Sequence, residues 1–284
     1  MRNRVCFGDN LPILRKMPAG GVALIYVDPP FNTGRTQRRR RLKTRRDPAG
    51  DRTGFQGARY RTTVLGEAGF DDAFDDYLAF LEPRLVEAHR VLAPNGSFYL
   101  HVDFREVHYC KVLLDRIFGR SCFLNEIIWA YDYGGRTKRR WPPKHDNILV
   151  YVKDPRNYVF NAEAVDRIPY MAPGLVGPEK AKRGKLPTDT WWHTIVSPTG
   201  GEKTGYATQK PLGILRRIIA ASSNAGDTVL DFFAGSGTTG AAAAELGRRF
   251  VLIDNNREAV RAMARRLADV PDVEFVGFDP AESP

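Results

Sequence analysis

Short apolar runs alternate along the chain with longer amphipathic segments. The apolar runs are rich in β-branched and aromatic residues, as expected of buried strands, and lie at 22–27, 97–102, 127–130, 148–152, 228–233 and 249–253. Between them, 74–92 and 105–118 carry apolar residues at helical spacing, and an Ala-rich helix follows residue 240. This alternation predicts an α/β fold, in which helices cover both faces of a Rossmann-like, doubly wound, mostly parallel sheet.

Two long stretches interrupt the alternation. Residues 35–66 are rich in Arg and Gly and predict a basic loop, which its length marks as functional or disordered. Residues 154–204 are rich in Pro, Gly, Lys and aromatic side chains, including Trp191 and Trp192. The regular pattern over 1–153 and 205–284 predicts one α/β domain, and 154–204 is predicted to be a small insertion in it.

A glycine-rich turn follows the predicted strand at 228–233. Gly235, Gly237 and Gly240 fit the pattern Gly-x-Gly-x-x-Gly, which lets a cofactor approach the backbone at the start of a helix. The next strand ends at Asp254, 23 residues after Asp231. An acidic residue at roughly that separation can accept hydrogen bonds from ribose hydroxyls. Together these features predict a nucleoside-cofactor site, although the glycine pattern alone would suit a dinucleotide equally well.

The tetrapeptide Asp28-Pro29-Pro30-Phe31 directly follows the predicted strand at 22–27. Because proline has no N–H, the Asp28 carboxylate and the carbonyl groups of this turn can act as acceptors for a substrate amine. Phe31 offers an apolar face on which a planar base can stack. The motif predicts a site for the exocyclic amino group of a nucleobase. The alternative is an ordinary strand exit with Phe31 in the core.

Positive charge is concentrated in two short stretches. The chain has a formal net charge of +10, and most of the excess comes from residues 35–46, which favours a polyanionic partner. We predict phosphate contacts from this segment, the alternatives being a solvated loop or a nuclear-localisation signal. Basic and aromatic residues are also interleaved at 136–141. The candidate DNA-binding residues are Arg38, Arg39, Arg40, Arg41, Arg136, Lys138, Arg139, Arg140 and Trp141.

The remaining signals mainly exclude other classes of protein. The three cysteines are widely spaced and support neither a disulfide framework nor a zinc site. The histidines show no metal-binding spacing, and His101 is interpreted as packed or solvated. The N-terminus has no secretory segment, and no apolar run is long enough to span a membrane, so a cytoplasmic, nucleoid-associated protein of prokaryotic type is expected.

The order of these motifs resembles the beta class of S-adenosylmethionine-dependent DNA amino-methyltransferases, which methylate adenine N6 or cytosine N4. The resemblance covers about 5–267, and the catalytic tetrapeptide precedes the cofactor glycine loop, as in that class. Further segments that match the family lie at 8–14, 125–129, 144–153 and 208–211. The resemblance implies the class I methyltransferase fold with a permuted motif order and S-adenosyl-L-methionine as the cofactor.

The resemblance also implies roles for individual residues. Asp28, Pro29, Pro30 and Phe31 would form the catalytic motif, and 154–204 would be the target-recognition region. Within the cofactor site, Asp9 would lie at the adenine edge and Lys210 near the methionine carboxylate. The complete set of implied cofactor-binding residues is Asp9, Asp28, Lys210, Asp231, Phe233, Gly235, Ser236, Gly237, Thr238, Asp254 and Asn255.

The predicted function is methyl transfer to the amino group of a flipped-out base in double-stranded DNA, with adenine N6 favoured over cytosine N4. A homodimer and a cognate restriction enzyme, as in restriction-modification systems, are further partners that the resemblance leaves open. Three alternatives remain: a nicotinamide-dependent oxidoreductase, a non-catalytic nucleic-acid-binding protein, and an amino-methyltransferase that acts on RNA or protein. The oxidoreductase alternative assigns no role to Asp28-Pro29-Pro30-Phe31.

Overall fold

The computed structural model describes residues 2–34, 37–53, 57–70, 72, 74–132, 137–197, 200–206 and 208–280. Within these ranges, the backbone but not the side chains is described for residues 37–44, 52, 62 and 64–70. The chain forms two compact units. One comprises Met1–Phe31 and Asp76–Pro284, and the other comprises Asn32–Asp75.

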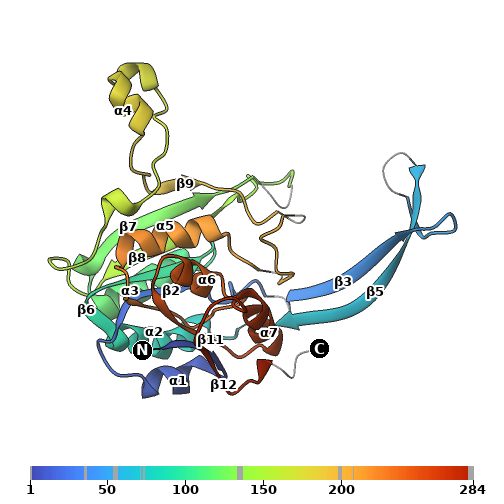
Figure 1. Ribbon diagram of the computed structural model, residues 1–284, viewed down its shortest axis with the longest axis horizontal. Helices are drawn as coiled ribbons and strands as arrows, with labels where there is room; N and C mark the ends of the chain where they lie inside the picture. The colour runs from blue at the N-terminus through green and yellow to red at the C-terminus, as the bar shows by residue number, and fades with distance from the viewer. Residues whose placement is uncertain are drawn as a thin grey trace. The chain divides into compact units, whose positions relative to one another are not determined.

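A nine-stranded sheet, counted over the described residues, forms the centre of the larger unit (Figure 1). Its strands in spatial order are β12 (Val273–Val276), β1 (Asn3–Phe7), β11 (Arg249–Asp254), β10 (Thr228–Asp231), β2 (Val22–Val27), β6 (Leu92–Val102), β8 (His145–Val152), β7 (Phe123–Ala130) and β9 (Thr190–Trp192). All neighbouring pairs are parallel except β6–β8 and β8–β7. The prediction of a mostly parallel sheet is therefore confirmed.

Helices cover the two faces of this sheet. The helices α1 (Asn10–Lys16), α2 (Tyr77–Val91) and α3 (Val107–Phe118) pack against one another on one face. The helices α5 (Leu212–Ser222), α6 (Thr238–Glu245) and α7 (Arg257–Arg266) lie on the other (Figure 1). Side-chain caps fix the starts of several of these helices, because an acceptor side chain satisfies an otherwise unpaired N–H of the first turn. The caps are Asp9 for α1, Asp76 for α2 and Asn256 for α7.

The face beneath α5, α6 and α7 contains a continuous apolar core. Leu24 of β2, Leu252 of β11 and Ile218 of α5 are essentially inaccessible to solvent. Burial of each such side chain contributes about 1.5–3 kcal/mol to the free energy of folding. A Cβ atom at Gly240 would lie only 2.6 Å from Leu252 Cδ1, so any larger residue there would displace Leu252 where α6 crosses β11. The sheet is thus a rigid support for the strand ends.

The smaller unit is an antiparallel sheet, in the order β3 (Gln37–Arg46), β5 (Arg59–Phe70) and β4 (Arg52–Thr53). The register pairs Arg46 with Tyr60 and Gln37 with Phe70, with an irregularity between Arg41 and Leu42. The prediction of a loop over 35–66 is therefore wrong for Gln37–Arg46, Arg52–Thr53 and residues 59–66, which form strands. The prediction rested on the richness of this stretch in Arg and Gly, but backbone pairing between strands does not require apolar side chains.

The region 154–204 belongs to the larger unit. It contains the short helices η3 (Ala162–Ala164), η4 (Pro173–Leu175) and α4 (Pro178–Arg183) and the strand β9, which pairs with β7 of the main sheet. A further short helix, η2 (Arg120–Cys122), precedes β7. The compact units therefore divide near residues 32 and 75, whereas the sequence placed the domain boundaries at 154 and 204. Among the described residues, no helix is both long and apolar enough to cross a membrane.

Candidate active site

Three acidic residues lie at the carboxyl ends of adjacent parallel strands. Asp28 follows β2, Asp231 ends β10 and Asp254 ends β11. Since neighbouring parallel strands end at the same edge of a sheet, the two predicted motifs meet there, although they are some 200 residues apart. The charge of Asp28 and that of Asp254 both act on Asp231. The tetrapeptide Asp28-Pro29-Pro30-Phe31 and the glycine turn therefore lie at one edge of the sheet and form one candidate site.

The Asp28 carboxylate is paired with a lysine from a distant segment. Lys210 Nζ donates to Asp28 Oδ2, and the two side chains are only 13% and 14% exposed. The same ammonium lies 5.1 Å from the centroid of the Phe31 ring. The other carboxylate oxygen, Asp28 Oδ1, is buried and has no hydrogen-bond partner among the described residues. One carboxylate oxygen is therefore paired with an ammonium, and the other has no hydrogen-bond donor among the described residues.

A buried polar network lies beside Phe31. His101 of β6 lies 5.9 Å from the Phe31 ring centroid and is completely buried. The His101 Nδ1 atom is 2.7 Å from the Tyr26 hydroxyl, and its Nε2 atom is 3.2 Å from Asp146 Oδ2. Tyr131 donates its hydroxyl to the second oxygen of Asp146, at 3.0 Å. The network joins the ends of four strands and holds the His101 ring in place beside Phe31.

The charge of Asp146 is stabilised within this network. Burial acts to raise the pKa of Asp146, but the hydrogen bond and charge of His101, the charge of Lys210 and the Tyr131 hydroxyl together hold it below its ordinary value. From sequence, His101 is expected to be packed or solvated, with no polar partner indicated. The available signal was its place two residues after Tyr99, on the same face of a buried strand.

The glycine turn has the geometry that its sequence predicts. Gly235 and Gly237 have positive φ angles of 50° and 74°, which favour glycine. Asp254 Oδ2 accepts a hydrogen bond from the Gly235 N–H at 2.8 Å, so the acidic end of β11 fixes the turn. A Cβ atom at Gly237 would lie 2.8 Å from Met263 Cγ of α7, which leaves no room for a larger residue.

Burial raises the pKa of two of the three carboxylic acids. The pKa of Asp231 is raised to about 7 by burial, although Thr239 and the Phe233 N–H donate hydrogen bonds to it at 2.6 and 3.0 Å. The pKa of Asp254 is raised to about 6, again by burial. Carboxylates that are this costly to ionise favour a cationic or hydrogen-bond-donating ligand beside them.

The opening segment of the chain packs against the glycine turn. Asn10 donates its side-chain amide to the Phe232 carbonyl at 2.7 Å. Arg84 donates to Asp9 at 3.0 Å and lies 4.0 Å from the Phe80 ring centroid. Phe80 in turn contacts Phe233, with ring centroids 6.0 Å apart. Asp9 and Phe233 thus belong to one cluster, which is connected by Arg84 and Phe80, two residues that no sequence motif indicates.

The other candidate residues differ in their surroundings. The Ser236 and Thr238 hydroxyls are 3.3 Å apart at the start of α6, and Asn255 lies directly after Asp254. Trp141 is 94% exposed, and Lys138, Arg139 and Arg140 are also exposed. Arg136 lies outside the described residues, as do the side chains of Arg38, Arg39, Arg40 and Arg41.

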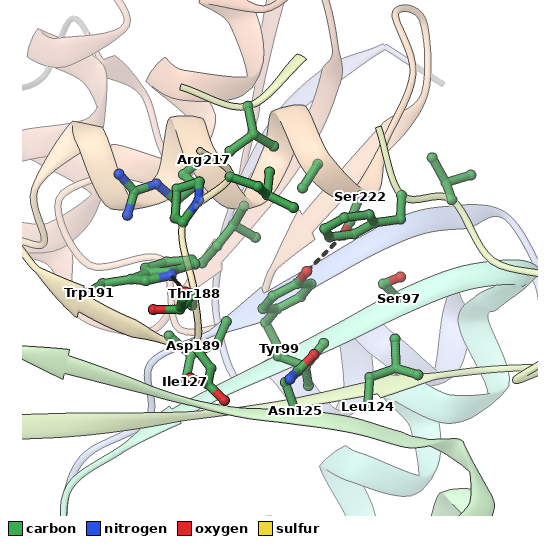
Figure 2. A pocket seen from close by; sticks show the side chains of 18 of the residues that line it. Ser97, Tyr99, Leu124, Asn125, Ile127, Thr188, Asp189, Trp191, Arg217 and Ser222 are labelled. Carbon is green, nitrogen blue, oxygen red and sulfur yellow. Dashed lines mark hydrogen bonds between the residues drawn. The ribbon is translucent and has the colours of Figure 1, made fainter. Parts of the chain in front are cut away.

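A separate cavity of about 590 Å³ lies between the sheet and the region 154–204. Figure 2 shows Trp191 and Arg217 on one side of it and Tyr99 hydrogen-bonded to Ser222 on the other. The Arg217 guanidinium is 4.8 Å from the Trp191 ring, and the two hydroxyls are 2.7 Å apart. The residues that line this cavity differ from those of the acidic site. Because they come from both the sheet and 154–204, part of 154–204 packs against the sheet.

Comparison with known proteins identifies the family. The family model described as DNA methylase matches residues 22–265. The chain is 34% identical over 276 residues to the DNA adenine methyltransferase YhdJ of Escherichia coli K12, covering 93% of this chain and 82% of that protein. It is 31% identical to the type II methyltransferase M.HpaI of Haemophilus parainfluenzae, covering 98% and 77%.

A solved structure supports the same fold. The M1.HpyAVI–SAM complex superposes with a TM-score of 0.59 at 21% identity, covering 93% of this chain and 98% of that one. The chain therefore belongs to the DNA N6/N4 methyltransferase family, with the class I methyltransferase fold. It is a DNA methyltransferase that uses S-adenosyl-L-methionine, as its family does. This excludes the oxidoreductase and the non-catalytic alternatives.

The residues present fit this cofactor. S-adenosyl-L-methionine carries a positive sulfonium, ribose hydroxyls and a carboxylate. The site offers buried acids in Asp231 and Asp254, a turn closed to any side chain at Gly237, and one cation in Lys210. Among the described residues, no group of three or more His, Cys, Asp or Glu side chains is arranged to hold a metal ion.

The contact at Gly237 leads to a matched test of the turn. Gly237 and Gly247 have nearly identical φ angles, 74° and 73°, but no atom lies within 4 Å of a Cβ at Gly247. Gly247→Ala should cost about 1–2 kcal/mol in the free energy of unfolding through backbone strain alone. Gly237→Ala should cost a further 1–3 kcal/mol, roughly, through overpacking against Met263. Denaturant unfolding measures both, and equal losses would contradict the contact.

The raised acid pKa values predict a pH dependence of cofactor binding. A ligand group that donates a hydrogen bond to Asp254 binds the ionised carboxylate. Burial favours the protonated acid, so Asp254 must lose its proton before such a ligand can bind. The affinity for S-adenosyl-L-homocysteine, measured by calorimetry, should therefore fall as the pH is lowered from 8 to 5. Well below pH 6 the fall should approach about tenfold per pH unit for each such group. Asp254→Asn should flatten the lower part of this profile, and an unchanged profile would contradict the assignment.

Proposed function

We propose that this DNA methyltransferase modifies the N6 amino group of adenine, and that Asp28-Pro29-Pro30-Phe31 contacts that amino group. The observation that carries this proposal is the buried acceptor Asp28 Oδ1, which has no hydrogen-bond partner among the described residues, on a carboxylate whose other oxygen binds the ammonium that lies over the Phe31 ring. The choice of adenine is supported by the relative YhdJ, a DNA adenine methyltransferase with which the chain shares most of its length. Methylation of cytosine N4 is the second candidate, since the family includes both reactions.

The chemistry requires two hydrogen-bond acceptors on one amine. The lone pair of an exocyclic amine is delocalised into the ring, which makes the nitrogen a poor nucleophile. Asp28 and the Pro29 carbonyl would each accept one of its hydrogens and so localise the lone pair on nitrogen. Neither Pro29 nor Pro30 has an N–H, so this turn presents no competing donor from those positions. Phe31 would stack on the flipped-out base.

The acidic edge of the sheet would hold the cofactor. Asp254 would accept hydrogen bonds from the ribose, and Asp231 would lie near the methionine end. The Gly235–Thr238 turn would give the close backbone approach, with Asp9 at the adenine edge. When bound, S-adenosyl-L-methionine supplies an electrophilic methyl group on a sulfonium. The buried carboxylates of the site would stabilise that positive charge before transfer and keep the methyl group beside the amine.

DNA would contact the protein through residues outside this edge. The exposed Trp141 and its basic neighbours can support an unstacked base and neutralise phosphates. The region 154–204 is proposed as the target-recognition region, and its exposed helix α4 carries Lys180, Lys182 and Arg183. We also propose phosphate contacts for Arg38 to Arg41. A cognate restriction enzyme is proposed from the similarity to a type II methyltransferase, and a homodimer remains a proposal from the sequence.

Loss of the Asp28 charge should separate catalysis from cofactor binding. Asp28→Asn keeps the shape of the side chain but removes the anionic acceptor, so kcat should fall by about 10²–10⁴. The affinity for S-adenosyl-L-homocysteine should change by only a few-fold, because Asp231 and Asp254 remain. Asp269→Asn, which removes an exposed charge from α7's C-terminal side, is the control and should retain full turnover. Near-normal kcat in Asp28→Asn would overturn the assigned role.

The target base can be identified directly. DNA incubated with the protein and isotope-labelled S-adenosyl-L-methionine should yield labelled N6-methyldeoxyadenosine when its nucleosides are analysed by mass spectrometry. Labelled N4-methyldeoxycytidine alone would replace adenine with cytosine and leave the roles at Asp28 unchanged. Sequencing of the methylated DNA would give the recognition sequence. RNA treated in parallel serves as the substrate control, and label in RNA alone would refute the DNA substrate.

A further inference from the structure

Lys210 connects the two halves of the site. Its side chain reaches Asp28 Oδ2 and lies over the Phe31 ring, whereas its own carbonyl accepts a hydrogen bond from the Thr238 hydroxyl at 3.2 Å. Thr238 is the first residue of α6, directly after the glycine turn. The backbone of Lys210 is therefore anchored to the cofactor side, while its ammonium lies on the side of the target base.

The ammonium makes the two contacts that the proposed function assigns to the base. It donates to Asp28, as the exocyclic amine would, and it occupies the face of Phe31, on which the base would stack. Asp28 Oδ1 stays vacant, but the ring face does not. A stacked base and this ammonium cannot occupy the same side of Phe31 together, because each requires close contact with the ring.

We propose that Lys210 is a positioning residue that keeps the base site closed in the free enzyme and must leave Asp28 before the target base can enter. The proposal rests on the proposed function, which places the base against Asp28 and Phe31. Its effect is an order of binding: the site accepts a flipped base readily only after Lys210 has found another anionic partner.

The methionine carboxylate of the cofactor is an anion of suitable chemistry. Lys210 is mostly buried, so withdrawal of its ammonium from Asp28 without a new anion would be costly. The anchored backbone at Thr238 keeps the side chain within the cofactor half of the site after it turns. The sulfonium charge of the cofactor would also repel a second cation held at Asp28 and favour the withdrawn position of Lys210.

This arrangement couples the two ligands thermodynamically. A ligand that withdraws Lys210 should strengthen capture of the target base, and a captured base should strengthen binding of that ligand by the same factor. Only ligands that carry the carboxylate of the amino-acid end should have this effect. Such selectivity distinguishes the proposal from general stabilisation of the fold, because any ligand of the adenosine half would also stabilise the fold.

Base extrusion can be followed without turnover. A duplex that carries 2-aminopurine at the methylated position becomes fluorescent when that base leaves the stack. With the natural enzyme, saturating S-adenosyl-L-homocysteine should tighten formation of the fluorescent complex by about tenfold, a typical coupling factor. 5′-Methylthioadenosine, which lacks the amino-acid end, should leave it nearly unchanged. Equal effects of the two compounds would overturn the proposal.

Variants of Lys210 provide the second arm. Lys210→Met should form the fluorescent complex without any cofactor analogue, and its coupling factor should fall close to one. Lys203→Met removes an exposed lysine from the same segment and should keep the coupling of the natural enzyme. Lys210→Arg keeps the charge and should restore part of it. Unchanged coupling in Lys210→Met would overturn the proposal.

The two compounds compared on the natural enzyme decide the question even if Lys210→Met does not fold, which its circular dichroism would reveal. Failure of this inference also differs from failure of the proposed function. The proposed function fails if 2-aminopurine at the adenine position is extruded by neither the natural enzyme nor the variants, or if Asp28→Asn retains turnover. If only this inference fails, extrusion and methylation proceed, but the coupling is independent of Lys210 and of the amino-acid end.

Discussion

The site depends on one electrostatic constraint: three carboxylic acids, Asp231 buried and Asp28 and Asp254 partly shielded from solvent, lie at the ends of adjacent strands. The alignment of β2, β10 and β11 places Asp28, Asp231 and Asp254 at one edge of the sheet. Their mutual repulsion and loss of solvent would be costly without compensation. Lys210 compensates Asp28, Thr239 donates to Asp231, and backbone N–H groups donate to Asp254. The edge is thus already arranged for a cationic ligand.

The same constraint divides the site into two halves with different kinds of support. On the cofactor side, the glycine turn is held by a hydrogen bond to Asp254 and by close packing against Met263. On the base side, Phe31 rests beside the buried pair of His101 and Asp146. The residues that hold the glycine turn and those beside Phe31 belong to strands of the sheet or to helices packed on it. Such rigid elements are needed for a site whose groups must keep their geometry during the reaction.

The parts of the site that local sequence determines could be predicted, whereas the pairings over long distances could not. The positive φ angle at position 237 favours glycine, and Asp28 directly follows its strand. Both residues can therefore be recognised from short sequence motifs. The partners Lys210 and Asp28 are 182 residues apart, and no local pattern specifies such a contact. The pairing of β3 with β5 was missed for a similar reason, since it depends on backbone hydrogen bonds and not on apolar spacing.

The identity of residue 28 follows from the charge balance of the free site. An amide there could still accept a hydrogen bond from a substrate amine, so acceptance alone does not require a carboxylate. An amide would, however, leave the mostly buried ammonium of Lys210 without its anion. A carboxylate gives a neutral pair before the ligands bind and an anionic acceptor after Lys210 has moved. The aspartate is therefore the residue type that serves both states of the site.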